Sequence, residues 1–99
     1  MSKSEFVAKA NEKQAWLPGK KIKFDFGSEG TVLLDGVAGR AAEEDGPADT
    51  TIKVSWEDFT AMGEGRLDGM TAFMTGKLKV EGDMSNAMQL QGVLSKLKG

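Results

Sequence analysis

The side chains of this chain that could do acid–base chemistry are carboxylates and lysines. Its 99 residues contain no histidine, no cysteine and no tyrosine. This excludes Ser/His/Asp and Cys/His nucleophilic catalysis, and it excludes metal sites built from histidine or cysteine. The acidic run Glu43-Glu44-Asp45 stands directly before Gly46-Pro47, so a solvated turn explains it, with a paired-carboxylate site as the alternative. We therefore predict that the protein is not an enzyme and requires no cofactor or metal ion.

Charge and hydropathy narrow the class of protein further. The 13 basic and 15 acidic residues nearly cancel, and there is no basic patch beyond Lys20, Lys21 and Lys23, which argues against a nucleic-acid partner. The opening residues MSKSEF lack the apolar stretch of a signal peptide, and no apolar run approaches the roughly 18 residues of a membrane span. We expect a cytoplasmic protein, and the length of the chain predicts one domain over residues 1–99.

The spacing of apolar residues changes between helix and strand periods along the chain. A short helix is predicted over residues 4–16, with Ser4 as its cap, and Pro18-Gly19 ends that segment. The predicted strands cover residues 20–26, 31–35, 37–43, 51–54 and 77–81. Further helices are predicted over residues 56–62, with Ser55 as the cap, over 69–74, with Asp68 as the cap, and over 84–98. The short connections between the first strands favour antiparallel pairing. The order of elements predicts an α+β domain with its helices on one face of the sheet.

The last predicted helix is more apolar than a helix that only lies on a sheet. Its apolar side chains cover an arc of roughly 220°, whereas packing on a sheet needs a stripe of only about 100°. The arc contains Met84, Ala87, Met88, Leu90, Val93, Leu94 and Leu97, and Gln91 lies inside it. We infer two apolar neighbours, of which the sheet is one. Gln91 is interpreted either as a group that orients a ligand headgroup or as a side chain bonded to nearby backbone.

Methionines are concentrated in the second half of the chain. Apart from Met1, all of them lie between residues 62 and 88, on the predicted helices and near Phe59 and Phe73. Methionine is flexible and polarisable, so it suits surfaces that fit ligands of varied shape, and it also fills gaps in small cores. The sequence leaves both interpretations open.

Several segments of the second half resemble one known family. They are Ser55-Trp56-Glu57-Asp58-Phe59, Gly65-Arg66-Leu67, the stretch AFMTGKLKVEGDM over residues 72–84, and Ala87-Met88-Gln89-Leu90. In this order and without gaps, the chain over residues 55–97 closely resembles the sterol carrier protein 2 lipid-binding domain family. Over residues 20–54 only the strand pattern agrees with that family.

The resemblance implies a fold and a function. The fold is a five-stranded mixed, largely antiparallel sheet covered on one face by helices, with an apolar tunnel between the two layers. The function is intracellular binding and transfer of fatty acids, fatty acyl-CoA or sterols, without chemical change. By position, the ligand-binding residues would be Phe24, Val32, Leu34, Ile52, Val54, Phe59, Met62, Leu67, Met70, Phe73, Met74, Met84, Met88, Gln91 and Leu94.

The N-terminal segment departs from the family, whose members open with a longer and more apolar helix. Residues 1–18 offer only a short polar helix, which predicts either a wider tunnel or an apolar surface that a homodimer would bury. The alternative function is a protein–protein docking or dimerisation module that uses the apolar face of the last helix. A lipid carrier would also make transient contact with membranes.

Overall fold

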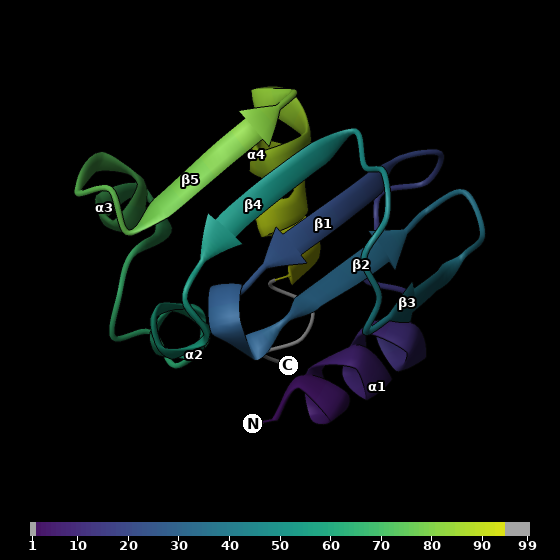
Figure 1. Ribbon diagram of the computed structural model, residues 1–99, viewed down its shortest axis with the longest axis horizontal. Coiled ribbons are helices and arrows are strands. Elements are labelled where there is room, and N and C mark those ends of the chain that lie inside the picture. The colour runs from purple at the N-terminus through teal and green to yellow at the C-terminus, as the bar shows by residue number, and fades with distance from the viewer. Residues whose placement is uncertain (1, 95–99) are drawn as a thin grey trace.

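Figure 1 shows the fold as a computed structural model, in which residues 2–94 are described. The elements are α1 (Lys3–Lys13), β1 (Lys21–Asp25), a 3-10 turn (Gly27–Glu29), β2 (Thr31–Asp35), β3 (Arg40–Ala42), β4 (Thr50–Val54), α2 (Trp56–Gly63), α3 (Gly69–Met74), β5 (Leu78–Gly82) and α4 (Met84–Leu94). The strands form one sheet in the order β3-β2-β1-β4-β5. The predicted α+β class with a five-stranded sheet is confirmed. Residues 95–98 of the last predicted helix lie outside the described residues.

The sheet is mixed, because β1 and β4 run parallel while the other three pairs are antiparallel. The turn pattern favoured antiparallel pairing among the first strands, which does not hold for β1–β4. The mixed, largely antiparallel sheet that the family resemblance implies is confirmed. The connection over residues 43–49 crosses in front of the sheet in Figure 1 instead of closing a hairpin. It is held there by a hydrogen bond from Thr31 Oγ1 to the Glu44 carbonyl (3.0 Å) and by Lys23 Nζ, 2.8 Å from Asp45 Oδ1. The crossing brings β4 beside β1 in the same direction.

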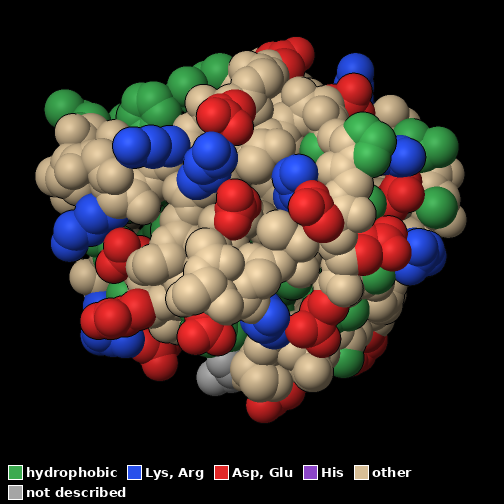
Figure 2. Space-filling model, viewed as in Figure 1, with side chains coloured by type: hydrophobic (Ala, Val, Ile, Leu, Met, Phe, Trp, Pro, Cys, Tyr) green, Lys and Arg blue, Asp and Glu red, His purple; other side chains and the backbone are tan. Residues whose placement is uncertain are grey.

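Alternate residues divide the sheet into a helix-covered face and an open face. The side chains toward the helices are at most 5% exposed and comprise Ile22, Phe24, Val32, Leu34, Ile52 and Val54. They share one core with residues of α1, α2 and α4. The open face, which is turned to the viewer in Figure 2, carries scattered acidic and basic side chains. The predicted placement of the helices on one face is therefore confirmed.

β3 is shorter than the predicted strand over residues 37–43. The carboxylate of Asp35 accepts hydrogen bonds from the backbone N–H groups of Ala38 (2.8 Å) and Val37 (2.9 Å), which folds residues 36–39 into a turn. These bonds, with the Ala38 bond contributing most, hold the pKa of Asp35 below its ordinary value although burial opposes them. Only residues 40–42 remain to pair with β2.

α1 is capped by Ser2, whose side chain accepts the N–H of Glu5 at 3.2 Å; the sequence prediction of Ser4 as the cap was wrong. The helix is polar on average, yet Phe6 and Ala10 are fully buried beneath it. It packs on β2 and β3. This short helix therefore covers part of the sheet.

An aromatic cluster joins α1, the end of β1 and α2. Its members are Phe6, Phe24, Phe26, Trp56 and Phe59. The Phe6 ring lies edge-on to Phe59 at a centroid distance of 4.9 Å and to Phe24 at 6.0 Å. Such edge-to-face pairs add about 0.5–1.5 kcal/mol each beyond the burial of their area. The cluster fixes the position of α1 against α2.

Candidate functional site

A partly enclosed cavity of about 540 Å³ lies between α1, α2, the start of α3 and α4. Its walls are formed by Phe6, Lys9, Phe59, Thr60, Met62, Gly63, Glu64, Gly65, Leu67, Asp68, Gly69, Gln91 and Leu94. The volume falls within the range of roughly 300–1,000 Å³ that small-molecule sites occupy.

The break between α2 and α3 provides one wall of this cavity. α2 starts where Ser55 Oγ accepts the N–H of Asp58 at 3.0 Å, and α3 starts where Asp68 accepts the N–H of Thr71 at 3.1 Å. Both predicted caps are confirmed. Between the helices, Gly65 adopts φ +80°, a conformation that favours glycine, and the chain turns back on the last turn of α2. The loop over residues 64–68 therefore closes one side of the cavity.

α4 provides the opposite wall, and a buried polar contact fixes its start. Thr50 Oγ1 donates to the carbonyl of Asp83 at 2.8 Å and accepts from Asn86 Nδ2 at 3.1 Å. Thr50 and Asn86 are only 1% and 4% exposed, so these bonds satisfy groups that water does not reach. Hydrogen bonds from the hydroxyl and the backbone N–H of Ser85 hold the pKa of Asp83 below its ordinary value. α4 is thereby anchored to β4.

The start of α3 and the end of α4 approach each other closely at Gly69. A Cβ atom at this position would lie 2.6 Å from Gln91 Nε2, which is closer than real Cβ contacts. A glycine is thus required here for Gln91 to keep its place at the cavity wall. The glycine also lies beside the terminal methyl of Met62, 3.5 Å from that Cβ position.

The polar side chains around the cavity fall into two groups. Thr60, Glu64 and Asp68 are engaged with Glu57, Arg66 and Thr71, respectively. The hydrogen bond from Arg66 holds the pKa of Glu64 below its ordinary value. Lys9 and Gln91, by contrast, form no ion pair or side-chain hydrogen bond with any described residue. They are the cavity's two polar side chains that remain available to a ligand.

The structure brings five of the predicted site residues together at the cavity. Phe59, Met62 and Leu67 come from α2 and the loop that follows it, and Gln91 and Leu94 come from α4. They line the same cavity from two walls. Their common position makes this cavity the candidate ligand site.

The predicted sheet residues lie elsewhere, in the packed core. Phe24, Val32, Leu34, Ile52 and Val54 are buried, and none of them lines the cavity. The physical reason is the aromatic cluster, whose rings fill the space between sheet and helices. The tunnel expected between the two layers stays a prediction, and the cavity described above lies between helices.

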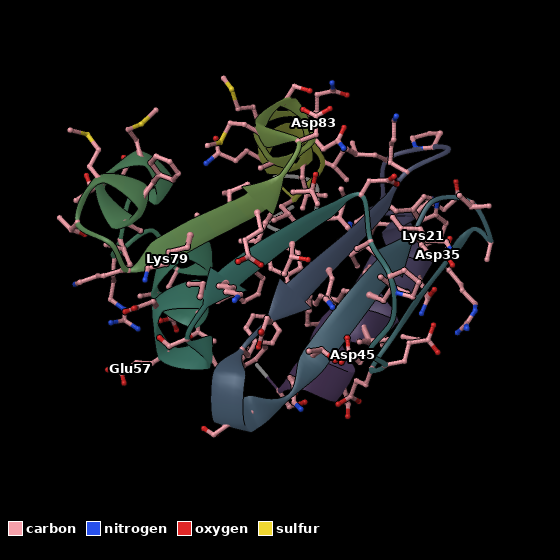
Figure 3. All side chains as sticks on the ribbon, turned by 45° about the horizontal axis from the view of Figure 1, so that its top comes forward. Lys21, Asp35, Asp45, Glu57, Lys79 and Asp83 are labelled. Carbon is pink, nitrogen blue, oxygen red and sulfur yellow. The ribbon has the colours of Figure 1, made fainter. Side chains whose placement is uncertain are left out.

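The remaining predicted site residues are exposed on α3 and α4. Met70, Phe73, Met74, Met84 and Met88 are between 40% and 78% exposed. In Figure 3 the sulfur-bearing side chains of α3 and α4 stand out from the ribbon. These residues form an apolar surface outside the cavity.

Phe6 and Lys9 are cavity residues that the sequence analysis did not assign to the site. Phe6 lies within the predicted first helix, but nothing in the sequence places that helix beside α2. Gly63 and Gly65 stand between two predicted helices and indicate only a break in helical structure. The break between two methionine-bearing helices is the sequence feature that could have predicted this wall of the cavity.

Residues 2–94 contain no group of three or more acidic side chains that could hold a metal ion. Among the same residues, no helix has the length and apolar character needed to cross a membrane.

Comparison with known proteins relates the chain to one family. A profile of the SCP-2 sterol transfer family matches residues 5–95. The chain is 39% identical over 70 residues to sterol carrier protein 2 of Gallus gallus and 37% identical over 70 residues to that of Homo sapiens. Each match covers 68% of this chain and 13% of the relative, so the chain spans about an eighth of these relatives' length.

Solved structures agree on the fold. Sterol carrier protein 2 of Aedes aegypti in complex with palmitate has a TM-score of 0.74 at 20% identity, covering 92% of both chains. The apo form of the Yarrowia lipolytica protein has a TM-score of 0.67 at 24% identity, covering 98% of this chain and 82% of that one. With the family profile covering nearly the whole sequence, the chain belongs to the SCP-2 sterol transfer family.

Proposed function

We propose that the protein binds a hydrophobic lipid in the cavity between α1, α2 and α4 and transfers it without chemical change. The observation that carries this proposal is a cavity of about 540 Å³ with largely apolar walls, on which Lys9 and Gln91 are engaged by no residue of the described part of the chain. Family membership supports it, as does the related Aedes aegypti protein solved with palmitate. The absence of histidine and cysteine from the sequence supports a carrier over an enzyme.

Burial of the lipid chain supplies the affinity. A 16-carbon chain contains about fifteen CH₂ and CH₃ groups, each worth ~0.8 kcal/mol when removed from water. The sum is roughly 12 kcal/mol, whereas a micromolar complex needs a binding free energy of about 8 kcal/mol. The difference is available to offset the entropy lost when the lipid is ordered and associates with the protein. The cavity can therefore bind such a lipid with few polar contacts.

The polar groups favour a ligand with an acidic headgroup. In our proposal the ammonium of Lys9 and the amide of Gln91 meet the carboxylate of a fatty acid or the polar end of an acyl-CoA. The hydrocarbon chain lies against Phe59, Met62 and Leu94. The ring centroids of Phe59 and Phe24 are 5.2 Å apart, so Phe59 packs directly on Phe24. Phe24 and the other buried sheet residues therefore contact the ligand only when a ring of the aromatic cluster moves aside.

Thermal unfolding of lipid-free protein tests the proposal. Palmitate, palmitoyl-CoA, cholesterol and a phospholipid are added in turn, with methyl palmitate as the uncharged control for palmitate. A ligand at 100 times its dissociation constant stabilises the fold by about 2.7 kcal/mol, which corresponds to a rise of roughly 10–20 °C in Tm for a domain of this size. We expect the largest shift from palmitate or palmitoyl-CoA and a smaller one from methyl palmitate. No shift with any of these lipids would contradict the proposal.

A further inference from the structure

The two edge strands of the sheet differ in whether another group bonds their outer backbone. At the β3 edge, the side chain of Asn11 on α1 accepts the N–H of Ala41 at 2.8 Å and donates to the Ala41 carbonyl at 3.0 Å. The side chain of Asn11 thus makes the two backbone hydrogen bonds that a neighbouring strand would make. At the opposite edge, β5 pairs only with β4, and no described residue bonds its outer side. An open strand edge is a template for pairing with another strand.

The outward backbone groups at the centre of β5 belong to Val80. The N–H of Asp83 donates to the Asp49 carbonyl at 3.5 Å, so these two residues, which continue the β4–β5 register, form a hydrogen-bonded pair. Such pairs alternate along an antiparallel ladder, so Glu81 and Lys79 also turn their backbone groups inward, toward β4. The N–H and C=O groups of Val80 therefore face the open side.

The charges along β5 are self-complementary. Lys77 and Lys79 precede Val80, and Glu81 and Asp83 follow it, so the signs invert about Val80. Figure 3 labels Lys79 and Asp83 toward opposite ends of the strand. A second copy of β5, antiparallel and centred on Val80, would place each Lys79 opposite the other Glu81. In that register Val80 lies directly opposite the Val80 of the second copy, and these two residues can exchange N–H···O bonds.

An exposed apolar patch flanks the same edge. It consists of Met70, Phe73 and Met74 of α3 with Met84 and Met88 of α4, and both helices contact β5. In Figure 2 hydrophobic side chains gather along the upper left margin, over α3 and the outer edge of β5. α3 lies at the start of β5 and α4 at its end (Figure 1). Antiparallel pairing about Val80 would therefore set α3 of one copy against α4 of the other.

We propose that the protein forms a two-fold homodimer through β5, which joins two sheets into one continuous sheet. Backbone pairing and the Lys79–Glu81 contacts set the register, and the apolar patch supplies buried area. The patch is needed, because a stable dimer buries roughly 800 Å² on each partner, more than a pair of five-residue strands provides. No residue of β5 lines the lipid cavity, so the dimer does not depend on the proposed lipid function.

Sedimentation velocity of the full chain from about 1 µM to about 1 mM tests the dimer. We expect a species of twice the 10.6 kDa chain mass at the higher concentrations. Lys79→Glu and Glu81→Lys each place like charges opposite one another twice in the dimer, and each is expected to weaken it by roughly tenfold or more. The double variant K79E/E81K restores opposite charges and is expected to restore dimerisation.

A control variant distinguishes the contact of Glu81 across the dimer from the ion pair that Glu81 forms within one copy. Lys53 Nζ lies 3.4 Å from Glu81 Oε2 within one copy, so Lys53→Gln removes this pair without altering the edge and is expected to leave the dimer intact. Circular dichroism of every variant verifies its fold. A monomer at all concentrations would overturn the proposal, as would a dimer that neither single charge reversal weakens. A monomer that instead binds lipid vesicles through the apolar patch would also overturn it.

Discussion

Replacing Phe6 with alanine is expected to lower the free energy of unfolding by about 3–5 kcal/mol, as for other buried Phe→Ala changes. Phe6 is fully buried, and its ring lies within 6.5 Å of the rings of Phe24, Trp56 and Phe59. Truncation would leave a void among three rings and free α1 from α2. Urea unfolding monitored by tryptophan fluorescence measures the change.

The matched control for this prediction is Phe73→Ala. Phe73 is 40% exposed on α3, outside the core, so the same truncation is expected to cost less than about 1 kcal/mol. If Phe6→Ala lowered the free energy of unfolding as little as Phe73→Ala does, α1 would not be an integral part of the core. The polar N-terminal helix would then be a dispensable addition to the fold.

Replacing Gly63 with tryptophan is expected to weaken palmitate binding by roughly a hundredfold. Gly63 lines the cavity, and a Cβ added there meets no atom within 4 Å, so the indole enters the cavity without displacing the backbone. It would take the place of about three or four methylene groups of the ligand, each worth ~0.8 kcal/mol, or ~3 kcal/mol in all. Isothermal titration calorimetry with palmitate measures the loss.

Gly46→Trp is the matched control for the blocked cavity. A Cβ at Gly46 also meets nothing within 4 Å, but the residue lies in the connection between β3 and β4, outside the cavity. Its palmitate affinity is expected to stay within a factor of about two of the unaltered chain. Equal binding by the Gly63 and Gly46 variants would place the ligand outside this cavity.

The strands and the helix caps could be predicted from the sequence because each depends on residues that are neighbours along the chain. Alternation at Ile22, Phe24 and Phe26 predicted a strand with one buried face, and Ser55 and Asp68 marked the starts of two helices. The direction of β4 was not accessible from its own residues. It depends on where residues 43–49 cross the sheet, which is set by contacts such as that between Lys23 and Asp45.

The candidate site was predicted only in part because its walls meet through tertiary packing. Phe59, Met62 and Leu67 follow one another along the chain, and the apolar arc of the last helix indicated Leu94. Phe6 and Lys9 precede the start of α2 by 50 and 47 residues, and no local pattern places them there. The apolar period of α3 could not distinguish a ligand contact from an exposed surface at Met70 and Met74. Their roles in ligand binding stay predictions, as does a cytoplasmic location.

The most direct test of the cavity as the lipid site is an NMR titration of protein labelled with ¹³C at its methionine methyl groups. Met62 is the one methionine on the cavity wall among the described residues, while Met70, Met74, Met84 and Met88 are exposed elsewhere. Met62→Leu identifies the Met62 signal. With palmitate added to lipid-free protein kept dilute, we expect that signal to shift and the signals of the four exposed methionines to stay in place. Shifts confined to the exposed methionines, with Met62 unchanged, would contradict the account.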